Sequence, residues 1–472
     1  SGSNDAPTVS SAVTSSASED DAAYSLDLLT NASDADSSDT LNVNNLTLVS
    51  GDASGVTVSG NSLSIDPNAY NALADGESEV ITYSYDVEDG NGGSVAQTAT
   101  ITITGSNDAP TVSSAVTSSA SEDDAAYSLD LLTNASDADS SDTLNVNNLT
   151  LVSGDASGVT VSGNSLSIDP NIYNALATGE SEVITYSYEV EDGNGGSVAQ
   201  TATITITGSN DAPTVSSAVT SLANEADAAY SLDLLVNASD PDASDVLNVS
   251  NVTLVSGDAS GITINGNSLD VDPSAYSALA SGESEVVTYS YDILDGNGGT
   301  VSQTATITIT GDNAAPTVSA AVTSSASEDD SAYSVDLLEN ASDDDASNTL
   351  NVNNLTLTSG DASGITVNGN TLDVAPNAYN ALATGESEVI TYSYDVEDGN
   401  GGSVAQTATI TITGSNDAPT VSSAVTSSAS EDDAAYSLDL LTNASDADSS
   451  DTLNVNNLTL VSGDASGVTV SG

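Results

Sequence analysis

The sequence predicts an all-β protein made of tandem immunoglobulin-like β-sandwich domains in a linear array. Two observations support this prediction. A junction motif recurs at Asn4, Asn107, Asn210, Asn313 and Asn416, each 103 residues after the one before. Within each repeat, about seven short runs of alternating apolar and polar residues are separated by turn sequences, which is typical of a sandwich of about 100 residues.

The repeats define the expected domains. Four complete domains are expected at residues 1–105, 106–208, 209–311 and 312–414, with a partial domain at 415–472. The fifth piece matches the first 57 residues of repeat one and then stops. We therefore interpret the sequence as a fragment of a longer array, and we do not expect the partial sandwich to fold alone.

The first half of repeat one contains four strand signals. Residues 8–14 alternate weakly, whereas residues 23–29 alternate strictly between apolar and polar side chains. Residues 46–49 and 55–58 are two short strands separated by a Ser, Gly and Asp-rich segment of turn composition.

The second half of repeat one holds the longest strands. Residues 66–73 are expected to form one or two helical turns, with Asp66 as the N-cap and Pro67 at the first position. Residues 79–87 form a long strand, and residues 94–104 return antiparallel to it after a glycine-rich turn. One modest core per repeat follows from this pattern.

The charge composition excludes most biochemical functions. The chain contains 70 Asp and Glu residues and no Lys, Arg or His. Two carboxylates at 4 Å repel by about 4 kcal/mol at an effective dielectric constant near 20, so clustered acids need protons, distance or external cations. Nucleic acid is excluded as a partner because nothing neutralises its phosphates, and contact with an anionic membrane surface is excluded for the same reason.

The missing residue types narrow the chemistry further. Without Cys or His, there is no disulfide, thiolate or imidazole site, and carboxylates with carbonyls suit hard cations such as Ca²⁺. No apolar run reaches the length of a membrane-spanning helix. Ser residues have no base partner, and near-identical copies favour a mechanical module, so we expect no enzyme activity.

An Asp-x-Asp pair recurs in every repeat. Isolated pairs of this kind are usually solvated surface, but this one persists where Asp20 has become Ala226 and Asp39 has become Asn348. Alternate acids in a loop can turn toward one ion, so the persistence favours a metal site. The pairs are Asp34/Asp36, Asp137/Asp139, Asp240/Asp242, Asp343/Asp345 and Asp446/Asp448.

Several motifs in a fixed order resemble a known family. Residues 70–73 (Tyr-Asn-Ala-Leu), 83–93 (Tyr-Ser-Tyr to Asp-Gly-Asn-Gly-Gly), 100–105 and 107–110 (Asn-Asp-Ala-Pro) are similar to the VCBS and bacterial cadherin-like repeats of giant calcium-dependent adhesins. The chain also resembles the extender region of RTX adhesins exported by type I secretion. The resemblance implies immunoglobulin-like domains, calcium at the junctions and a stalk on the bacterial cell surface. The RTX nonapeptide is absent, so no β-roll is expected.

The resemblance also implies a ligand set for each junction. It comprises an acidic residue early in the domain, the Asp-x-Asp pair, an acidic strand end and the Asn-Asp linker. For the first junction these positions match Glu122, Asp137, Asp139, Glu88, Asp89, Asn107 and Asp108. Glu122 is expected near the Asp-x-Asp pair of its own repeat, and Glu88 with Asp89 reaches the junction only if the hairpin turn folds toward it. The complete expected set is Glu19, Asp34, Asp36, Glu88, Asp89, Asn107, Asp108, Glu122, Asp137, Asp139, Glu191, Asp192, Asn210, Asp211, Glu225, Asp240, Asp242, Asp295, Asp312, Asn313, Glu328, Asp343, Asp345, Glu397, Asp398, Asn416, Asp417, Glu431, Asp446 and Asp448.

The third junction, between repeats three and four, departs from this pattern. Leu294 stands where the other repeats have Glu, Ala314 replaces the linker Asp, and Asp312 replaces a Ser. Losses and a gain at one place indicate a rearranged ligand cluster. We predict that this junction holds fewer or weaker ions than the others.

Two functions fit the sequence. The first is a structural extender of a secreted adhesin, about 40 Å per domain, stiffened by calcium and carrying its ligand-binding domains elsewhere in the protein. Such a chain would be monomeric and would contact only its neighbouring repeats. The second is direct binding of a glycan or cell surface by the repeats, which the shortage of exposed aromatic residues disfavours. A row of threonines at residues 98–104 is interpreted as an exposed strand face rather than an ice-binding surface.

Overall fold

The computed structural model describes residues 2–471, and these residues form an all-β protein with four short 3₁₀ turns. The chain divides into two compact units. The first unit comprises Ser1–Thr214, Ser239–Leu247 and Leu294–Val301, and the second comprises Val215–Ala238, Asn248–Ile293 and Ser302–Gly472.

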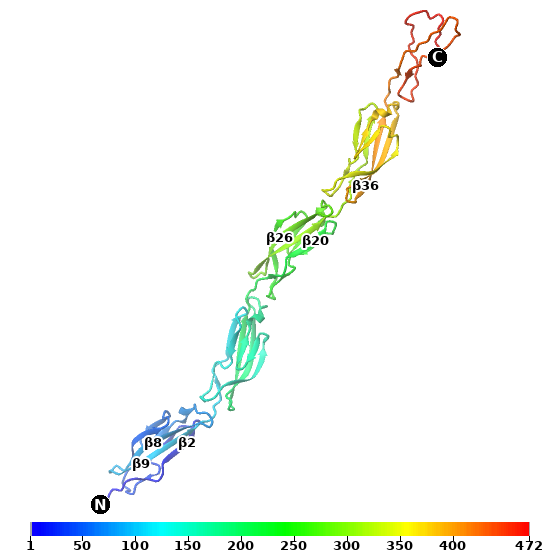
Figure 1. Cartoon of the computed structure of the whole chain (residues 1–472). Coiled ribbons are helices and arrows are strands. Elements are labelled where there is room, and N and C mark those ends of the chain that lie inside the picture. Colours follow the sequence, from blue (N-terminus) through cyan, green and yellow to red (C-terminus); the bar gives the residue numbers. More distant parts are fainter. Residues whose placement is uncertain (1, 472) are drawn as a thin grey trace. The chain divides into compact units, whose positions relative to one another are not determined.

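Each complete repeat contains a four-stranded sheet, a three-stranded sheet and a two-stranded ribbon. In repeat one the large sheet has the order β2-β9-β8-β5, the smaller sheet has the order β3-β7-β6, and β1 pairs with β4 (Figure 1). The elements of repeat one are β1 Thr8–Val9, β2 Val13–Ser18, β3 Tyr24–Asp27, β4 Ala32–Ser33, β5 Asn42–Ser50, β6 Val56–Ser59, β7 Ser62–Ile65, the 3₁₀ turn η1 Pro67–Tyr70, β8 Ser78–Glu88 and β9 Ser94–Thr104.

The same sheet orders recur in repeats two, three and four. Repeat two contains β10 Thr111–Val112, β11 Val116–Ser121, β12 Tyr127–Asp130, β13 Ala135–Ser136, β14 Asn145–Ser153, β15 Val159–Ser162, β16 Ser165–Ile168, η2 Pro170–Tyr173, β17 Ser181–Glu191 and β18 Ser197–Thr207. Repeat three contains β19 Thr214–Val215, β20 Val219–Asn224, β21 Tyr230–Asp233, β22 Ala238–Ser239, β23 Asn248–Ser256, β24 Ile262–Asn265, β25 Ser268–Val271, η3 Pro273–Tyr276, β26 Ser284–Leu294 and β27 Thr300–Thr310. Repeat four contains β28 Thr317–Val318, β29 Val322–Ser327, β30 Tyr333–Asp336, β31 Ala341–Ser342, β32 Asn351–Ser359, β33 Ile365–Asn368, β34 Thr371–Val374, η4 Pro376–Tyr379, β35 Ser387–Glu397 and β36 Ser403–Thr413.

The core of each repeat is built by the strict alternation of its two longest strands. In β8 the side chains of Ile81, Tyr83, Tyr85 and Val87 are buried, and the intervening residues face outward. The Tyr85 hydroxyl donates a hydrogen bond of 2.7 Å to the carbonyl oxygen of Leu28, which ties the large sheet to the segment after β3. Alternation with period two therefore places one apolar face inward, as the sequence predicts.

The direction of β2 decides where the acidic residues fall. β2 runs parallel to β9, and its last residue, Ser18, pairs with Thr104 at the end of β9. Glu19 is consequently held at the pole where the chain leaves the repeat, with its backbone N–H bonded to the Thr104 carbonyl. The β8–β9 turn, which contains Asp89, lies beside Asn4 at the pole where the chain enters. We call these the exit pole and the entry pole.

One local expectation is confirmed and another requires correction. The helical segment is a single 3₁₀ turn, Pro67–Tyr70, with Asp66 at the N-cap; the Asp66 side chain makes no capping bond, whereas those of Asp169 and Asp272 do in the next two repeats. The expected four-residue strand at 46–49 is part of the longer β5, whose register shifts between Asn44 and Thr47. Asn45 absorbs the shift with a φ of 55°, a conformation that Asn tolerates better than most residues.

Repeat five is mostly unpaired over its described residues. Its strands are β37 Thr420–Val421 and β38 Ala444–Ser445, which pair with each other. Large apolar side chains such as Tyr436, Leu460 and Val461 are exposed. The described residues of repeat five contain no strand that corresponds to β8 or β9 of repeat one.

Candidate metal centre

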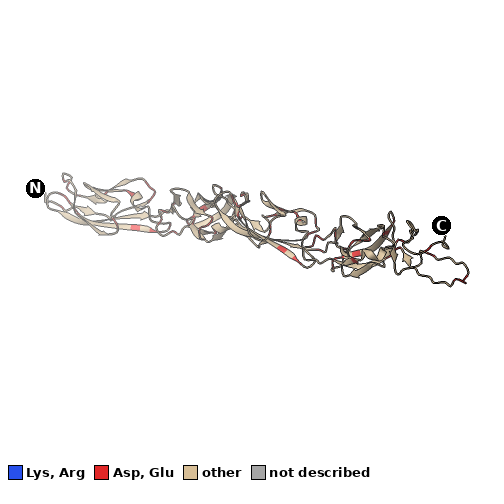
Figure 2. Cartoon of the chain, turned by 90° about the horizontal axis from the view of Figure 1, so that it is seen from above, with Lys and Arg blue, Asp and Glu red and all other residues tan. Residues whose placement is uncertain are grey.

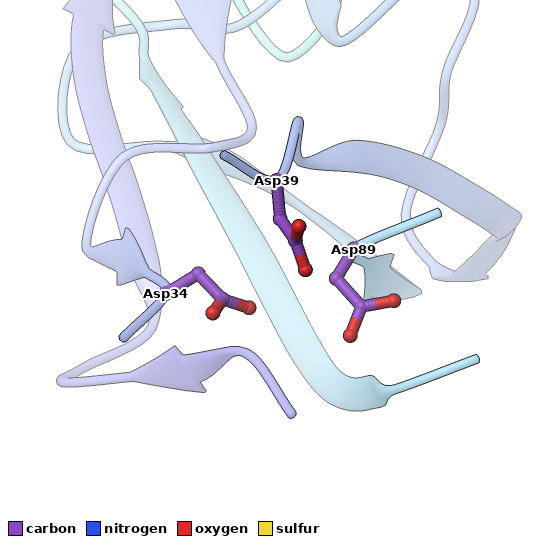
Figure 3. Close-up of side chains that lie close together, drawn as sticks. All are labelled: Asp34, Asp39 and Asp89. Atoms are coloured by element: carbon purple, nitrogen blue, oxygen red, sulfur yellow. The ribbon is translucent and has the colours of Figure 1, made fainter. Parts of the chain in front are cut away.

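The first acidic group lies at the entry pole of repeats one, two, three and five. In repeat one, a carboxylate oxygen from each of Asp34, Asp39 and Asp89 lies within 4.8 Å of the others (Figure 3). Asp34 and Asp39 come from the loop after β4, and Asp89 comes from the β8–β9 turn. The loop folds back on itself because the Asp39 N–H bonds to the Asp36 carbonyl, at 3.1 Å. Repeat two gathers Asp137, Asp142 and Asp192 in the same way.

Backbone and amide donors position the turn carboxylate. Asp89 Oδ1 accepts hydrogen bonds from the N–H groups of Asn91 and Gly93, and Oδ2 accepts one from the Asn4 side chain at 2.8 Å. The bond from Asn4, followed by those from the backbone, lowers the pKa of Asp89 below its ordinary value. A Cβ on Gly93 would collide with Asp89 Oδ2, so glycine is required at that position.

The second acidic group joins the exit pole of one repeat to the entry pole of the next. At the second junction, carboxylate oxygens of Glu122, Asp211 and Asp242 lie within 4.8 Å of one another. Glu122 follows β11, Asp211 is in the linker, and Asp242 is in the loop after β22. Asp242 also belongs to the entry-pole group with Asp240 and Asp245, so one residue connects the two groups.

Burial makes these charges costly in the absence of a cation. Glu122 is 0 % exposed and Asp242 is 2 % exposed. Desolvation raises the pKa of Glu122, and the nearby charges of Asp242 and Asp211 raise it further. The chain offers no Lys or Arg to balance them (Figure 2). A buried carboxylate without a counter-charge is strongly disfavoured, so the arrangement calls for cations from outside.

Unpartnered buried oxygens provide the test of whether the residues fit such an ion. Asp242 Oδ2 accepts the Asp211 N–H at 2.9 Å, yet its Oδ1 is buried with no hydrogen-bond partner. Buried polar atoms are nearly always hydrogen-bonded, so each unpartnered oxygen needs an explanation. The buried unpartnered oxygens belong to Glu19, Asp34, Asp39, Asn107, Asp137, Asp139, Asp142, Asn210, Glu225, Asp240, Asp242, Asp245, Asn313, Glu328, Asp343, Asp345 and Asp448. Oxygen-only donor sets of this kind fit Ca²⁺.

The linker hydrogen bonds of the second junction recur at the first and fourth, whereas among residues 2–471 the three-carboxylate group that spans a junction within 4.8 Å is found only at the second. At the first junction the Asp108 N–H bonds to Asp139 Oδ2 at 2.8 Å, and Glu19 Oε1 accepts the Ser106 N–H at 2.7 Å. At the fourth junction the Asp417 N–H bonds to Asp448 Oδ2 at 2.9 Å. The third junction has no linker carboxylate at this position, since residue 314 is Ala.

Direct hydrogen bonds also connect consecutive repeats. The N–H of Ser140 bonds to the carbonyl of Ala72 at the first junction, at 3.3 Å, and an equivalent backbone bond is present at each of the other three. The linker Asp is held by an Asn from the preceding repeat, in the pairs Asn71–Asp108, Asn174–Asp211 and Asn380–Asp417. These hydrogen bonds hold the linker in place without the help of an ion.

The structure corrects two of the expected groupings. Glu122 does not lie with Asp137 and Asp139 of its own repeat, because the parallel β11–β18 pair carries it to the exit pole, where it meets Asp211. Glu19 is its counterpart at the first junction, where the charges of Asp139 and Asp108 raise its pKa in addition to the larger effect of burial. Asp89 lies at the entry pole of repeat one.

The glutamates before the turn are placed outside both groups. Glu88 Oε1 accepts a hydrogen bond from Asn44 across the sheet at 3.0 Å, and Glu191 and Glu397 do the same with Asn147 and Asn353. Leu294 occupies this position in repeat three, beside Asp295 and Asn210. It therefore belongs to the second junction, and the expectation that its change and those at 312 and 314 fall at one pole is wrong.

The remaining expected residues lie in or beside the two groups, except for two in repeat five. Asp36 Oδ2 accepts the Asp5 N–H, and the amides of Asn107, Asn210 and Asn313 donate to Asp192, Asp295 and Asp398. In the partial fifth repeat, Asp446 and Asp448 gather with Asp451, whereas Asn416 and Glu431 are exposed.

Sequence reasoning missed one residue of the entry-pole group. Asp39, Asp142, Asp245 and Asp451 each stand three residues after the Asp-x-Asp pair and join it in the structure. The longer motif Asp-x-Asp-x-x-Asp contains this signal. The replacement of Asp39 by Asn348 in repeat four made the position look dispensable, although it marks a difference between junctions.

A family model for the cadherin-like domain matches residues 3–104, 106–207, 209–310 and 312–413. The chain belongs to the cadherin-like domain family. Cadherin domains bind calcium at interdomain junctions, and the acidic groups of these cadherin-like repeats are compatible with that property. Cadherin-like adhesion domains are non-enzymatic, and no helix among residues 2–471 is long and apolar enough to cross a membrane.

Solved structures similar to these cadherin-like repeats include several cadherins. Extracellular cadherin domains 1–5 of protocadherin gamma B2 show 14 % identity and a TM-score of 0.41, with 87 % of this chain and 81 % of that chain covered. Drosophila N-cadherin EC1-4 shows 14 % identity and a TM-score of 0.28, with 80 % of this chain and 93 % of that chain covered. The human desmocollin-1 ectodomain shows 13 % identity and a TM-score of 0.29, with 88 % of this chain and 83 % of that chain covered. No curated protein matches the chain.

Proposed function

We propose that the chain is an extender segment of a secreted bacterial surface adhesin, stiffened by calcium at its junctions, which holds a distal binding domain away from the cell. The observation that carries this proposal is the set of buried, unpartnered carboxylate oxygens shared between consecutive repeats. No internal cation is available to them. The resemblance to bacterial adhesin repeats supports the surface location.

The chain's own residues explain how stiffening would arise. At the second junction, Glu122 is fixed at the end of β11, Asp242 is fixed in the next repeat, and Asp211 is held between them by Asn174. Bound calcium supplies the positive charge that allows these carboxylates to remain close. Each ion then links two repeats, and the folded junction gains stability as free calcium rises above the dissociation constant.

Direct ligand binding by the repeats has less support. The tyrosines that a glycan could stack against are mostly in the core, with Tyr70, Tyr83 and Tyr85 buried in repeat one. A surface hollow of about 470 Å³ lies beside Asn45, Asp86 and Gln97, but it is open and has no exposed aromatic residue. A large, enclosed pocket with convergent polar groups is the usual mark of a ligand site.

Small-angle X-ray scattering of this chain tests the proposal. With calcium we expect a maximum dimension on the order of 180 Å, from about 40 Å per domain, and a profile typical of a rod. With a chelator we expect the profile of a flexible chain. Magnesium at the same concentration is the control for ionic strength. Identical profiles in calcium and chelator would mean that the carboxylates are not neutralised by calcium and would overturn the proposal.

A further inference from the structure

We propose that the third junction uses a relocated carboxylate, Asp312, in place of the missing linker Asp, and that it fills only at higher calcium than the other junctions, so that the chain bends there first. The inference rests on the proposed function and deepens it. Its first basis is a paired loss: where the other junctions have an Asn–Asp pair, the third has Ser277 and Ala314. The third junction therefore lacks both the linker carboxylate and the Asn side chain that holds it at the other junctions, which we call the clamp.

The entry-pole group of repeat four is altered as well. Asn348 stands where the other repeats have Asp, and both ends of its amide are hydrogen-bonded: Nδ2 donates to Asp345 Oδ2 at 3.0 Å, and Oδ1 accepts from Asn400 at 2.5 Å. At the second junction the equivalent Asp245 keeps a buried oxygen without a partner. Asn348 therefore occupies one oxygen of Asp345 with a hydrogen bond, and its own amide oxygen is already bonded and is not left unpartnered for an ion.

The third junction nevertheless has the buried oxygens of a cation site. Glu225 is 7 % exposed and Asp345 is 2 % exposed, and each has a buried oxygen with no hydrogen-bond partner. Asp343 and Asn313 each contribute one more. These atoms are the remaining parts of the two groups seen elsewhere, and they require the same explanation.

Asp312 adjoins this set through its backbone. Its backbone N–H bonds to Glu225 Oε1, at 3.2 Å rather than the 2.7 Å of the serines at the other junctions. Burial raises the pKa of Glu225 above its ordinary value, and the charges of Asp345 and Asp312 raise it further. Unlike the half-buried Asp108, Asp211 and Asp417, Asp312 is exposed, and its Oδ1 accepts the N–H of the adjacent Asn313 at 3.0 Å rather than an amide of the preceding repeat. An exposed ligand must be ordered when it binds an ion, so it binds more weakly than a partly buried one that a neighbouring side chain already holds.

Spin-label distance measurements on the full chain test this inference. The chain has no Cys, so labels can be attached at introduced cysteines alone. Thr57, Thr160, Thr263 and Thr366 occupy the same exposed strand position in successive repeats. The pair T57C/T160C reports on the first junction, and T263C/T366C reports on the third. The width of each distance distribution is measured during a calcium titration.

We expect the distance distribution of T57C/T160C, at the first junction, to narrow at low calcium. The distribution of T263C/T366C, at the third junction, should narrow only at about tenfold higher calcium. D312S should raise the calcium requirement of the third pair further and leave the first unchanged. The triple change S277N/A314D/N348D should lower it to that of the first pair. As the matched control, D108A/D142N should move the first pair toward the third.

The possible outcomes separate this inference from the proposed function. If both pairs narrow at the same calcium concentration, the relocated, weaker site is refuted, although calcium stiffening stands. If D312S has no effect, Asp312 is not a ligand. If neither pair responds to calcium, the proposed function itself fails.

Discussion

The second and third junctions are assembled from equivalent segments of successive repeats, yet their carboxylates are arranged differently. The second brings Glu122, Asp211 and Asp242 within 4.8 Å and shares Asp242 with an entry-pole group. Among residues 2–471, no group of three acids this close occurs at the third. The repeats on either side have the same sheet order and buried cores. Junction properties therefore vary through a few loop residues without any change in the domains.

Removal of calcium should have the largest effect and should separate the two junctions most clearly. Chelation is expected to raise hydrogen exchange at the amides of Ser209 and Asp211, which bond to Glu122 and Asp242, by on the order of 100-fold, which corresponds to loss of a ligand present at about 100 times its dissociation constant. The amides of Asp312 and Ala314 should change by about tenfold or less. Exchange followed by mass spectrometry measures both, and equal changes would erase the distinction.

The substitution D242N should be the most damaging single change at the second junction. Asp242 belongs to both acidic groups, so its loss weakens both ion positions. We expect the calcium needed for half-protection of the linker amides to rise on the order of 100-fold, the upper end of the effect of losing a residue that supports a metal. The matched D345N should raise it less at the third junction, where the groups are already incomplete. A larger effect of D345N would reverse the comparison.

The Asn clamp should affect the calcium requirement of a junction less than a residue that binds the ion directly. N174A removes the hydrogen bond to Asp211 but leaves the carboxylates in place, so we expect about a tenfold rise in the calcium requirement at the second junction. S277A at the third should have no measurable effect, because Ala314 offers no carboxylate for Ser277 to hold. Hydrogen exchange of the two linkers provides the measurement. A response to S277A would show that the clamp acts through something other than the linker Asp.

Removal of a core tyrosine hydroxyl should have the smallest effect, and its cost in stability should be the same in the two repeats that flank the third junction. The hydroxyls of Tyr291 and Tyr394 donate to the carbonyls of Leu234 and Leu337 at 2.8 and 2.7 Å. Y291F and Y394F should each destabilise their repeat by about 1 kcal/mol, measured by hydrogen exchange of core amides. Unequal costs would mean that the cores, as well as the junctions, differ.

Alkaline pH offers a check on the same core hydroxyls. Burial raises the pKa of Tyr394 to about 12, above the ordinary value of about 10. A raised pKa in the folded state means that stability is fully present below about pH 10 and is lost as the pH rises toward 12. Unfolding followed by tyrosinate absorbance should show a midpoint in this window for wild type. Y394F should unfold at higher pH in repeat four alone.

The sequence by itself determined the repeat, the β-class and the identity of most acidic residues at the junctions. Alternation with period two is local, because successive side chains on any strand face opposite sides, so Ile81, Tyr83 and Tyr85 could be assigned to one face without a structure. The total absence of cationic side chains likewise implied a need for external cations before any geometry was known.

Only the tertiary structure decided which acids meet. Glu19 stands between Asn4 and Asp34 in the sequence, yet the parallel pairing of β2 with β9 carries it to the opposite pole. Asp89 stands closer to Asp108 in sequence than to Asp34, yet the antiparallel return of β9 leaves it with Asp34. Strand direction is set by long-range sheet pairing and core packing, which no local pattern encodes, and it is this direction that distributes the carboxylates between the two ends of each repeat.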